Sequence, residues 1–189
     1  MRFYRDEDRV VMVDSVRITQ GLTIATADTA VAHGRELLVL TGAPRVAMGE
    51  TSTMEGERID FIYGGGELRR VILIGSASME DATPDSLASV YRGLPRLDVL
   101  EGDSISVHFR DEKIRRSVVV GSARSQYTPT DLTDEVATND VTGDTIIIGF
   151  RNERVHTVDV SGNMSGTYKF ARIAAMREML GQSRRLADM

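Results

Sequence analysis

The stretch from Gly143 to Gly162, GDTIIIGFRNERVHTVDVSG, decides the fold, because the chain contains three copies of its pattern. Earlier copies run from Gly56 to Gly75 (GERIDFIYGGGELRRVILIG) and from Gly102 to Gly121 (GDSISVHFRDEKIRRSVVVG). In each copy the two glycines are 19 residues apart (75 − 56, 121 − 102 and 162 − 143), and a polar turn separates two apolar runs. This pattern is typical of a β-hairpin.

The copies begin 46 and then 41 residues apart (102 − 56 and 143 − 102), within the range of repeat architectures. A unit of this kind cannot bury its apolar face alone, so neighbouring units stack and share one interior. We therefore expect an all-β, elongated body of tandem hairpins over residues 10–168, with repeats at 56–75, 102–121 and 143–162.

Apolar residues alternate within each repeat. The fourth, sixth and eighth positions of each first strand are apolar, and successive side chains of a strand point to opposite faces. The return strands carry apolar residues on the matching face. The residues predicted to line the shared groove or core are Ile59, Phe61, Tyr63, Val71, Leu73, Ile105, Val107, Phe109, Val119, Ile146, Ile148, Phe150, Val158 and Val160.

Composition narrows the class of protein. The chain has 189 residues, enough to bury a core, and a net charge of −5 gives no general attraction to nucleic acids or anionic membranes. No apolar run approaches about 18 residues, so we expect no membrane span. Residues 1–10 contain no apolar signal-peptide segment, which indicates a cytosolic chain or a mature or truncated one.

Three segments depart from the strand pattern. Residues 79–101 contain two prolines and read as a long loop, and residues 128–141 read as a polar connector. From Lys169 to about Leu180 the apolar period changes to that of a helix, which predicts a short C-terminal helix or tail over 169–189. This segment either covers an open end of the β body or frays.

Catalytic and metal-binding patterns are weak. His33, His108 and His156 have no partner at the spacing of a zinc site. The glycines at 64–66 form a turn without the helix and lysine of a phosphate-binding loop. We expect no cofactor, no metal and no enzymatic activity.

Several strings resemble the OstA-like family of lipopolysaccharide-transport proteins. Val16–Gly21, Ala27-Asp28 and Leu40–Val46 follow the family's order of strand, glycine, strand, Ala-Asp, strand and Thr-Gly. The hairpin copies continue it, as do the strings at 121–127 and 139–144. Together the matches cover residues 10–168. The family often has Gly-Asn where this chain has Asp14-Ser15.

The resemblance implies an open, twisted β-jellyroll, whose two sheets meet in a V with apolar residues inside. It also implies a non-catalytic periplasmic carrier, part of the bridge between the two membranes, that shields the acyl chains of lipopolysaccharide or a related glycolipid. In that case we expect a signal peptide to have been removed or truncated from this chain.

The alternation of apolar and polar residues along the strands is also compatible with a second function. The same apolar residues would also form a closed, dry core, as in a structural β-repeat scaffold or interaction module without a lipid ligand. Either architecture ends in strands with unpaired backbone groups. We therefore expect end-to-end strand addition to another copy or to another OstA-like domain, unless the terminal segments cover both ends and leave a monomer.

Overall fold

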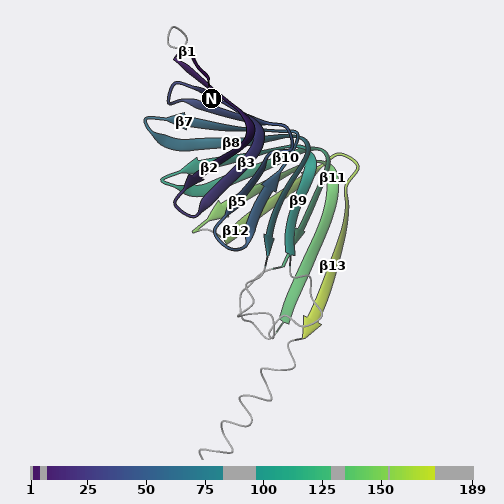
Figure 1. Ribbon diagram of the computed structural model, residues 1–189. Helices are drawn as coiled ribbons and strands as arrows, with labels where there is room; N and C mark the ends of the chain where they lie inside the picture. The colour runs from purple at the N-terminus through teal and green to yellow at the C-terminus, as the bar shows by residue number, and fades with distance from the viewer. Residues whose placement is uncertain (1, 5–7, 83–96, 129–134, 153, 173–189) are drawn as a thin grey trace, which may run out of the picture.

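The computed structural model describes residues 2–4, 8–82, 97–128, 135–152 and 154–172. Within these ranges the secondary structure consists of β-strands joined by turns, which form one long antiparallel sheet (Figure 1). The strands are β1 (Arg2–Tyr4), β2 (Arg9–Gln20), β3 (Thr23–His33), β4 (Leu37–Thr41), β5 (Arg45–Met48), β6 (Ser52–Glu55), β7 (Arg58–Gly64), β8 (Glu67–Ala82), β9 (Leu97–Arg110), β10 (Lys113–Tyr127), β11 (Glu135–Arg151), β12 (Arg154–Ser161) and β13 (Ser165–Arg172).

The sheet bends at corners where two successive residues adopt positive φ angles. Such angles strain residues other than glycine, and a pair of them turns the backbone sharply. At three of the corners the ladders of β2, β8 and β10 shift register. At the other two corners one strand ends and the next begins, β4 before β5 and β12 before β13. The corner pairs are Asp14–Ser15, Gly42–Ala43, Gly75–Ser76, Gly121–Ser122 and Gly162–Asn163.

The corners explain the 19-residue spacing of the glycines. A β-carbon on Gly143 would lie 3.1 Å from the carbonyl oxygen of Gly162, and one on Gly102 would lie 3.1 Å from that of Gly121. The two glycines of a repeat therefore meet at a corner, where the backbones of neighbouring strands approach too closely for a larger residue. The repeat marks a bend in the sheet.

The corners divide the sheet into two half-sheets. The first half-sheet contains β4, β7, β12 and the segments of β8–β11 nearest the hairpin turns. The second contains β5, β6, β13 and the remaining segments of β8–β11. One buried cluster includes residues of both, so their inner faces pack against each other. This is the expected β-jellyroll arrangement.

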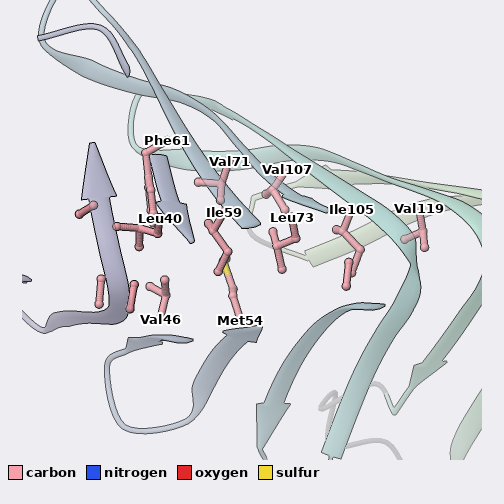
Figure 2. Close-up of a cluster of buried hydrophobic side chains, with 14 of the residues drawn as sticks. Leu40, Val46, Met54, Ile59, Phe61, Val71, Leu73, Ile105, Val107 and Val119 are labelled. Carbon is pink, nitrogen blue, oxygen red and sulfur yellow. The ribbon is translucent and has the colours of Figure 1, made fainter. Parts of the chain in front are cut away.

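The centre of the core is a continuous row of residues that pair across adjacent strands. Because adjacent strands pair in register, each of these residues lies beside the next on the inner face of the first half-sheet. All are 0–1% exposed. Val46 and Met54 of the second half-sheet point toward this row (Figure 2). The row consists of Leu40, Ile59, Leu73, Ile105, Val119 and Ile146.

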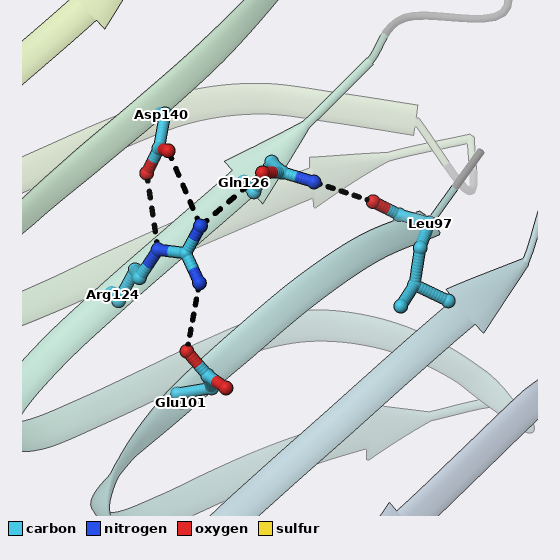
Figure 3. A network of polar contacts seen from close by, with 5 residues as sticks. All are labelled: Leu97, Glu101, Arg124, Gln126 and Asp140. Carbon is cyan, nitrogen blue, oxygen red and sulfur yellow. Dashed lines mark hydrogen bonds and ion pairs between the residues drawn. The ribbon is translucent and has the colours of Figure 1, made fainter. Parts of the chain in front are cut away.

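Arg124 joins three strands of the second half-sheet (Figure 3). Its guanidinium donates to Glu101 on β9 at 3.1 Å and, through two nitrogens, to Asp140 on β11 at 3.2 and 3.3 Å. The same group donates to Gln126 at 3.2 Å, and the Gln126 amide donates to the carbonyl of Leu97 at 3.0 Å. The hydrogen bonds to Asp140 and Glu101 raise the pKa of Arg124. The whole network holds β9, β10 and β11 in register.

Four expectations from the sequence need correction, the fourth being the loop at 79–101, which is strand at 79–82 and 97–101. The glycines do not end the hairpins, since β8 and β10 continue through the corners to Ala82 and Tyr127. The polar connector at 128–141 is strand from Glu135 onward, because β11 pairs with β13 there. The C-terminal helix does not begin at Lys169, because β13 continues to Arg172.

Parts of these predictions fall outside the described residues. These parts are the remainder of the predicted helix, residues 173–189, and the centre of the predicted loop, residues 83–96. The flanks of that loop are strand, namely the end of β8 and the start of β9.

Candidate functional site

A cavity of about 420 Å³ lies between the two half-sheets, over strands β8–β12. The first half-sheet contributes Phe109, Glu112, Lys113, Ile114, Ser117, Ile148, Phe150, Val155 and Val158. The second contributes Met79, Asp81, Asp98, Val99, Leu100, Ser125, Gln126, Tyr127 and Asn139. Aliphatic and aromatic side chains line most of it, and the charged ones come from the outer ends of the two half-sheets.

A change in side-chain size explains why the space opens here. At the N-terminal end Met54 is 1% exposed and packs against the first half-sheet. Across the strands of the second half-sheet, Met54 pairs with Met79, Met79 with Leu100, and Leu100 with Ser125. On the opposite half-sheet Ser117 interrupts a row of valines and isoleucines. Two small serines on the two walls leave a volume that larger residues fill elsewhere.

The predicted groove residues fall into three groups. Four of them line the cavity: Phe109, Ile148, Phe150 and Val158. Tyr63 and Val160 are partly buried and pack against the core. The remaining predicted residues are buried in the filled part of the core: Ile59, Phe61, Val71, Leu73, Ile105, Val107, Val119 and Ile146. The sequence therefore predicted the inner face, and the structure divides that face into a packed part and an open part.

Two carboxylates stand at the outer end of the second half-sheet. Asp81 on β8 and Asp98 on β9 are directly opposite each other across the ladder. Asp81 accepts hydrogen bonds from the hydroxyls of Thr51 and Ser52, each at 2.8 Å, and Asp98 accepts one from the backbone N–H of Thr128 at 2.8 Å. These contacts fix both carboxylates at the wall of the cavity.

Burial raises the pKa of Asp98 to about 6. The hydrogen bond from Thr128 acts in the opposite direction, and the neighbouring charge of Asp81 adds to the rise. A like charge directly opposite on the adjacent strand disfavours ionisation of Asp98. This end of the cavity therefore changes charge in the mildly acidic range.

Sequence reasoning missed Ser117, four other residues of the first half-sheet and the residues of the second half-sheet. The four are Glu112, Lys113, Ile114 and Val155. Ser117 is fully buried in the wall and lies between Val107 and Ile148 across the ladder. An alignment of the three repeats would have found it, since Val71 and Val158 occupy the equivalent positions (71 − 56, 117 − 102 and 158 − 143 are all 15). The second wall had no such signal, because its residues lie outside the repeated stretch.

Chemically, the arrangement favours apolar contact. Within the described ranges, acidic and histidine side chains do not gather in a group of three that could hold a metal ion. No helix of the described part of the chain is long and apolar enough to cross a membrane. The cavity offers a mainly aliphatic surface with a few polar groups, which suits an apolar chain with a polar end.

Comparison with known proteins gives a structural match. No protein-family model matches the chain, and no curated protein does. Among solved structures the chain is similar to LptH, described as the LptA-homologous periplasmic component of the conserved lipopolysaccharide transport device from Pseudomonas aeruginosa. The TM-score is 0.50 at 13% sequence identity, over 87% of this chain and 97% of that one. The likeness shows a shared β-jellyroll fold.

Proposed function

We propose that this chain is a non-catalytic carrier in the periplasm, which shields the acyl chains of lipopolysaccharide or a related glycolipid during transport to the outer membrane. The observation that carries the proposal is the cavity of about 420 Å³ between the half-sheets, within a fold shared with LptH. LptH is a periplasmic component of a lipopolysaccharide transport device. A carrier of this kind needs an apolar interior and no catalytic groups.

Burial of an acyl chain supplies the binding free energy. Each methylene group withdrawn from water contributes roughly 0.8 kcal/mol, without any directional contact. In this proposal Phe109, Ile148, Phe150 and Val158 contact the chain directly. The fully buried residues, such as Ile105, form the packed wall behind them.

A pair of matched substitutions tests the carrier role. Val158→Phe places a larger side chain into the cavity, and Val120→Phe places the same side chain on the outer face, where Val120 is 45% exposed. Uptake of a fluorescent acyl probe and the lipid that co-purifies with the chain, identified by mass spectrometry, are the readouts. We expect Val158→Phe to reduce both and Val120→Phe to reduce neither. Absence of lipid from the wild-type chain, together with no probe uptake, would reject the proposal.

A structural scaffold is the second candidate. The filled N-terminal part of the core favours it, since Leu40, Ile59 and Leu73 are fully buried there in one cluster with Met54 of the second half-sheet. A scaffold would take up no lipid, and both valine variants would behave like the wild type. The uptake experiment therefore separates the two functions.

We also propose that the chain adds strands end to end, to itself or to another domain of this fold. Among the described strands, β12 and β13 pair only with β11, and β1 pairs only with β2, so each end of the sheet presents unpaired backbone groups. Light scattering over a concentration series should show a mass that increases with concentration. A constant monomer mass would contradict this part of the proposal.

A further inference from the structure

Ser117 is a polar residue in an otherwise apolar row. Its Cα partners across the ladder are Val107 and Ile148, and the same row continues to Val71 on one side and Val158 on the other. The other two repeats place valine at the equivalent position. Packing of this row therefore does not require a hydroxyl, since valine fills it in both other copies.

The Ser117 hydroxyl is buried without a hydrogen-bond partner among the residues that the structure describes. The residue is 0% exposed and lines the cavity together with Phe109 and Val158. A buried hydroxyl that makes no hydrogen bond destabilises the protein, and nearly all such groups in proteins are paired. Ser117 borders the cavity, so a ligand that shifts a neighbouring side chain can reach the buried hydroxyl and supply the missing partner.

We propose that Ser117 binds a hydroxyl group carried on the acyl chain of the ligand, and so selects hydroxylated over plain acyl chains. The inference rests on the proposed carrier function. The partner is a neutral group, because Val107 and Ile148 flank Ser117 on both sides and an ion there would lose its hydration without compensation. A hydroxyl also donates and accepts, as the serine does.

The position of Ser117 adds a geometric expectation. It lies on the first half-sheet, whereas the carboxylates of Asp81 and Asp98 belong to the second. The hydroxyl of the ligand would therefore bind at the apolar wall of the first half-sheet, away from the carboxylates of Asp81 and Asp98. Only a hydroxyl at a particular carbon of the chain reaches Ser117, so the preference depends on its position.

A two-by-two comparison tests this inference. The ligands are a fatty acid and its analogues of equal chain length, each with one hydroxyl at a different carbon, and the proteins are the wild type and Ser117→Ala. Affinity is measured by displacement of a fluorescent acyl probe. We expect the wild type to prefer one hydroxylated analogue by roughly three- to tenfold, the effect of one hydrogen bond. In Ser117→Ala this preference disappears, while the affinity for the plain fatty acid stays the same or increases.

Two further variants support the comparison. Ser104→Ala removes a hydroxyl from the outer face of the neighbouring strand β9 and should retain the preference. Ser117→Val reproduces the residue of the other repeats and should behave like Ser117→Ala. Equal wild-type affinities for all analogues, or a preference that survives in Ser117→Ala, would overturn the inference and leave the carrier function intact. Binding of none of the fatty acids would overturn the inference, and together with no uptake of the acyl probe and no co-purified lipid it would overturn the carrier function as well.

Discussion

The carboxylate of Asp103 occupies the space that a β-carbon on Gly121 would fill. The same relationship joins Asp144 to Gly162, Glu57 to Gly75 and Asp28 to Gly42. At three of these corners the backbone N–H of the acidic residue donates to a carbonyl of the partner strand's corner: Asp28 to Gly42 at 3.1 Å, Glu57 to Gly75 at 3.0 Å and Asp144 to Gly162 at 2.9 Å. At these four corners the bend of the sheet thus depends on a glycine covered by a carboxylate.

Substitution of a corner glycine should therefore destabilise the fold strongly. In Gly121→Ala the φ angle of +78° strains an L-residue by about 1–2 kcal/mol, and the new β-carbon collides with Asp103. We expect a loss of about 3 kcal/mol in the free energy of unfolding, measured with urea. Gly21→Ala is the control, because its φ is +58° with open space around it, and it should lose about 1–2 kcal/mol. Equal losses at the two positions would contradict the collision.

The packed and open parts of the inner face should respond differently to truncation. Ile105→Ala removes a fully buried side chain and should cost about 2–5 kcal/mol. Phe109 lines the cavity and is only partly buried, so Phe109→Ala should cost less, about 1–2 kcal/mol, although phenylalanine is the larger residue. Urea unfolding of both variants measures the difference. A larger loss for Phe109→Ala would indicate that this end of the interior is packed as well.

Arg124 should contribute more than an ordinary surface ion pair. Arg124→Ala leaves Glu101 and Asp140 without their shared cation, and we expect a loss of about 1–2 kcal/mol in the free energy of unfolding. Arg124→Lys should recover only part of it, because an ammonium cannot reach both carboxylates with the planar guanidinium geometry. Arg45→Ala, which breaks the exposed pair with Glu55, should change stability by less than about 0.5 kcal/mol. Similar losses for Arg45→Ala and Arg124→Ala would count against the network.

The contribution of Asp98 to the stability of the fold should decrease as the pH increases from about 4 to about 6. The folded pKa of Asp98, about 6, lies above the ordinary value of 3.8, so the folded state binds the proton more tightly than the unfolded state does. Folding is favoured while the carboxyl is protonated, and this contribution, at most about 3 kcal/mol, is lost as the pH rises through the folded pKa. Asp98→Asn stays neutral and should remove this part of the pH dependence. Wild-type and Asp98→Asn curves of the same slope would contradict the pKa of Asp98.

Much of the fold was predictable from the repeats. The spacing of Gly102 and Gly121 predicted paired strands, and the alternation of residues such as Ile105 and Val107 predicted the inner face. The repeats did not reveal that the glycines are corners, because a turn and a bend both require small residues. Asp14–Ser15 takes the same pair of positive φ angles without glycine, so no glycine marked the first corner in the sequence.

The cavity itself could not be predicted from the repeats, because they define the inner face of only one half-sheet. Its existence depends on the distance between the half-sheets and on the size of residues on both walls, and the second wall lies outside the repeated stretch. Ser125 and Asn139 line it, yet in the sequence they stand in polar surroundings. Alternation predicts which side chains point inward, and it carries no information on how far apart two inward faces lie.

Two adjacent residues of β11 offer the most direct test of the carrier function. Ile148 lines the cavity, whereas Ile147 pairs with Val118 and Asp159 on the opposite face of the sheet. A photoreactive amino acid is placed at either position, the chain is exposed to acylated glycolipid and light, and the crosslinked lipid is quantified by mass spectrometry. We predict strong labelling from position 148 and little from position 147. Equal labelling from both positions, or none from position 148, would contradict the account.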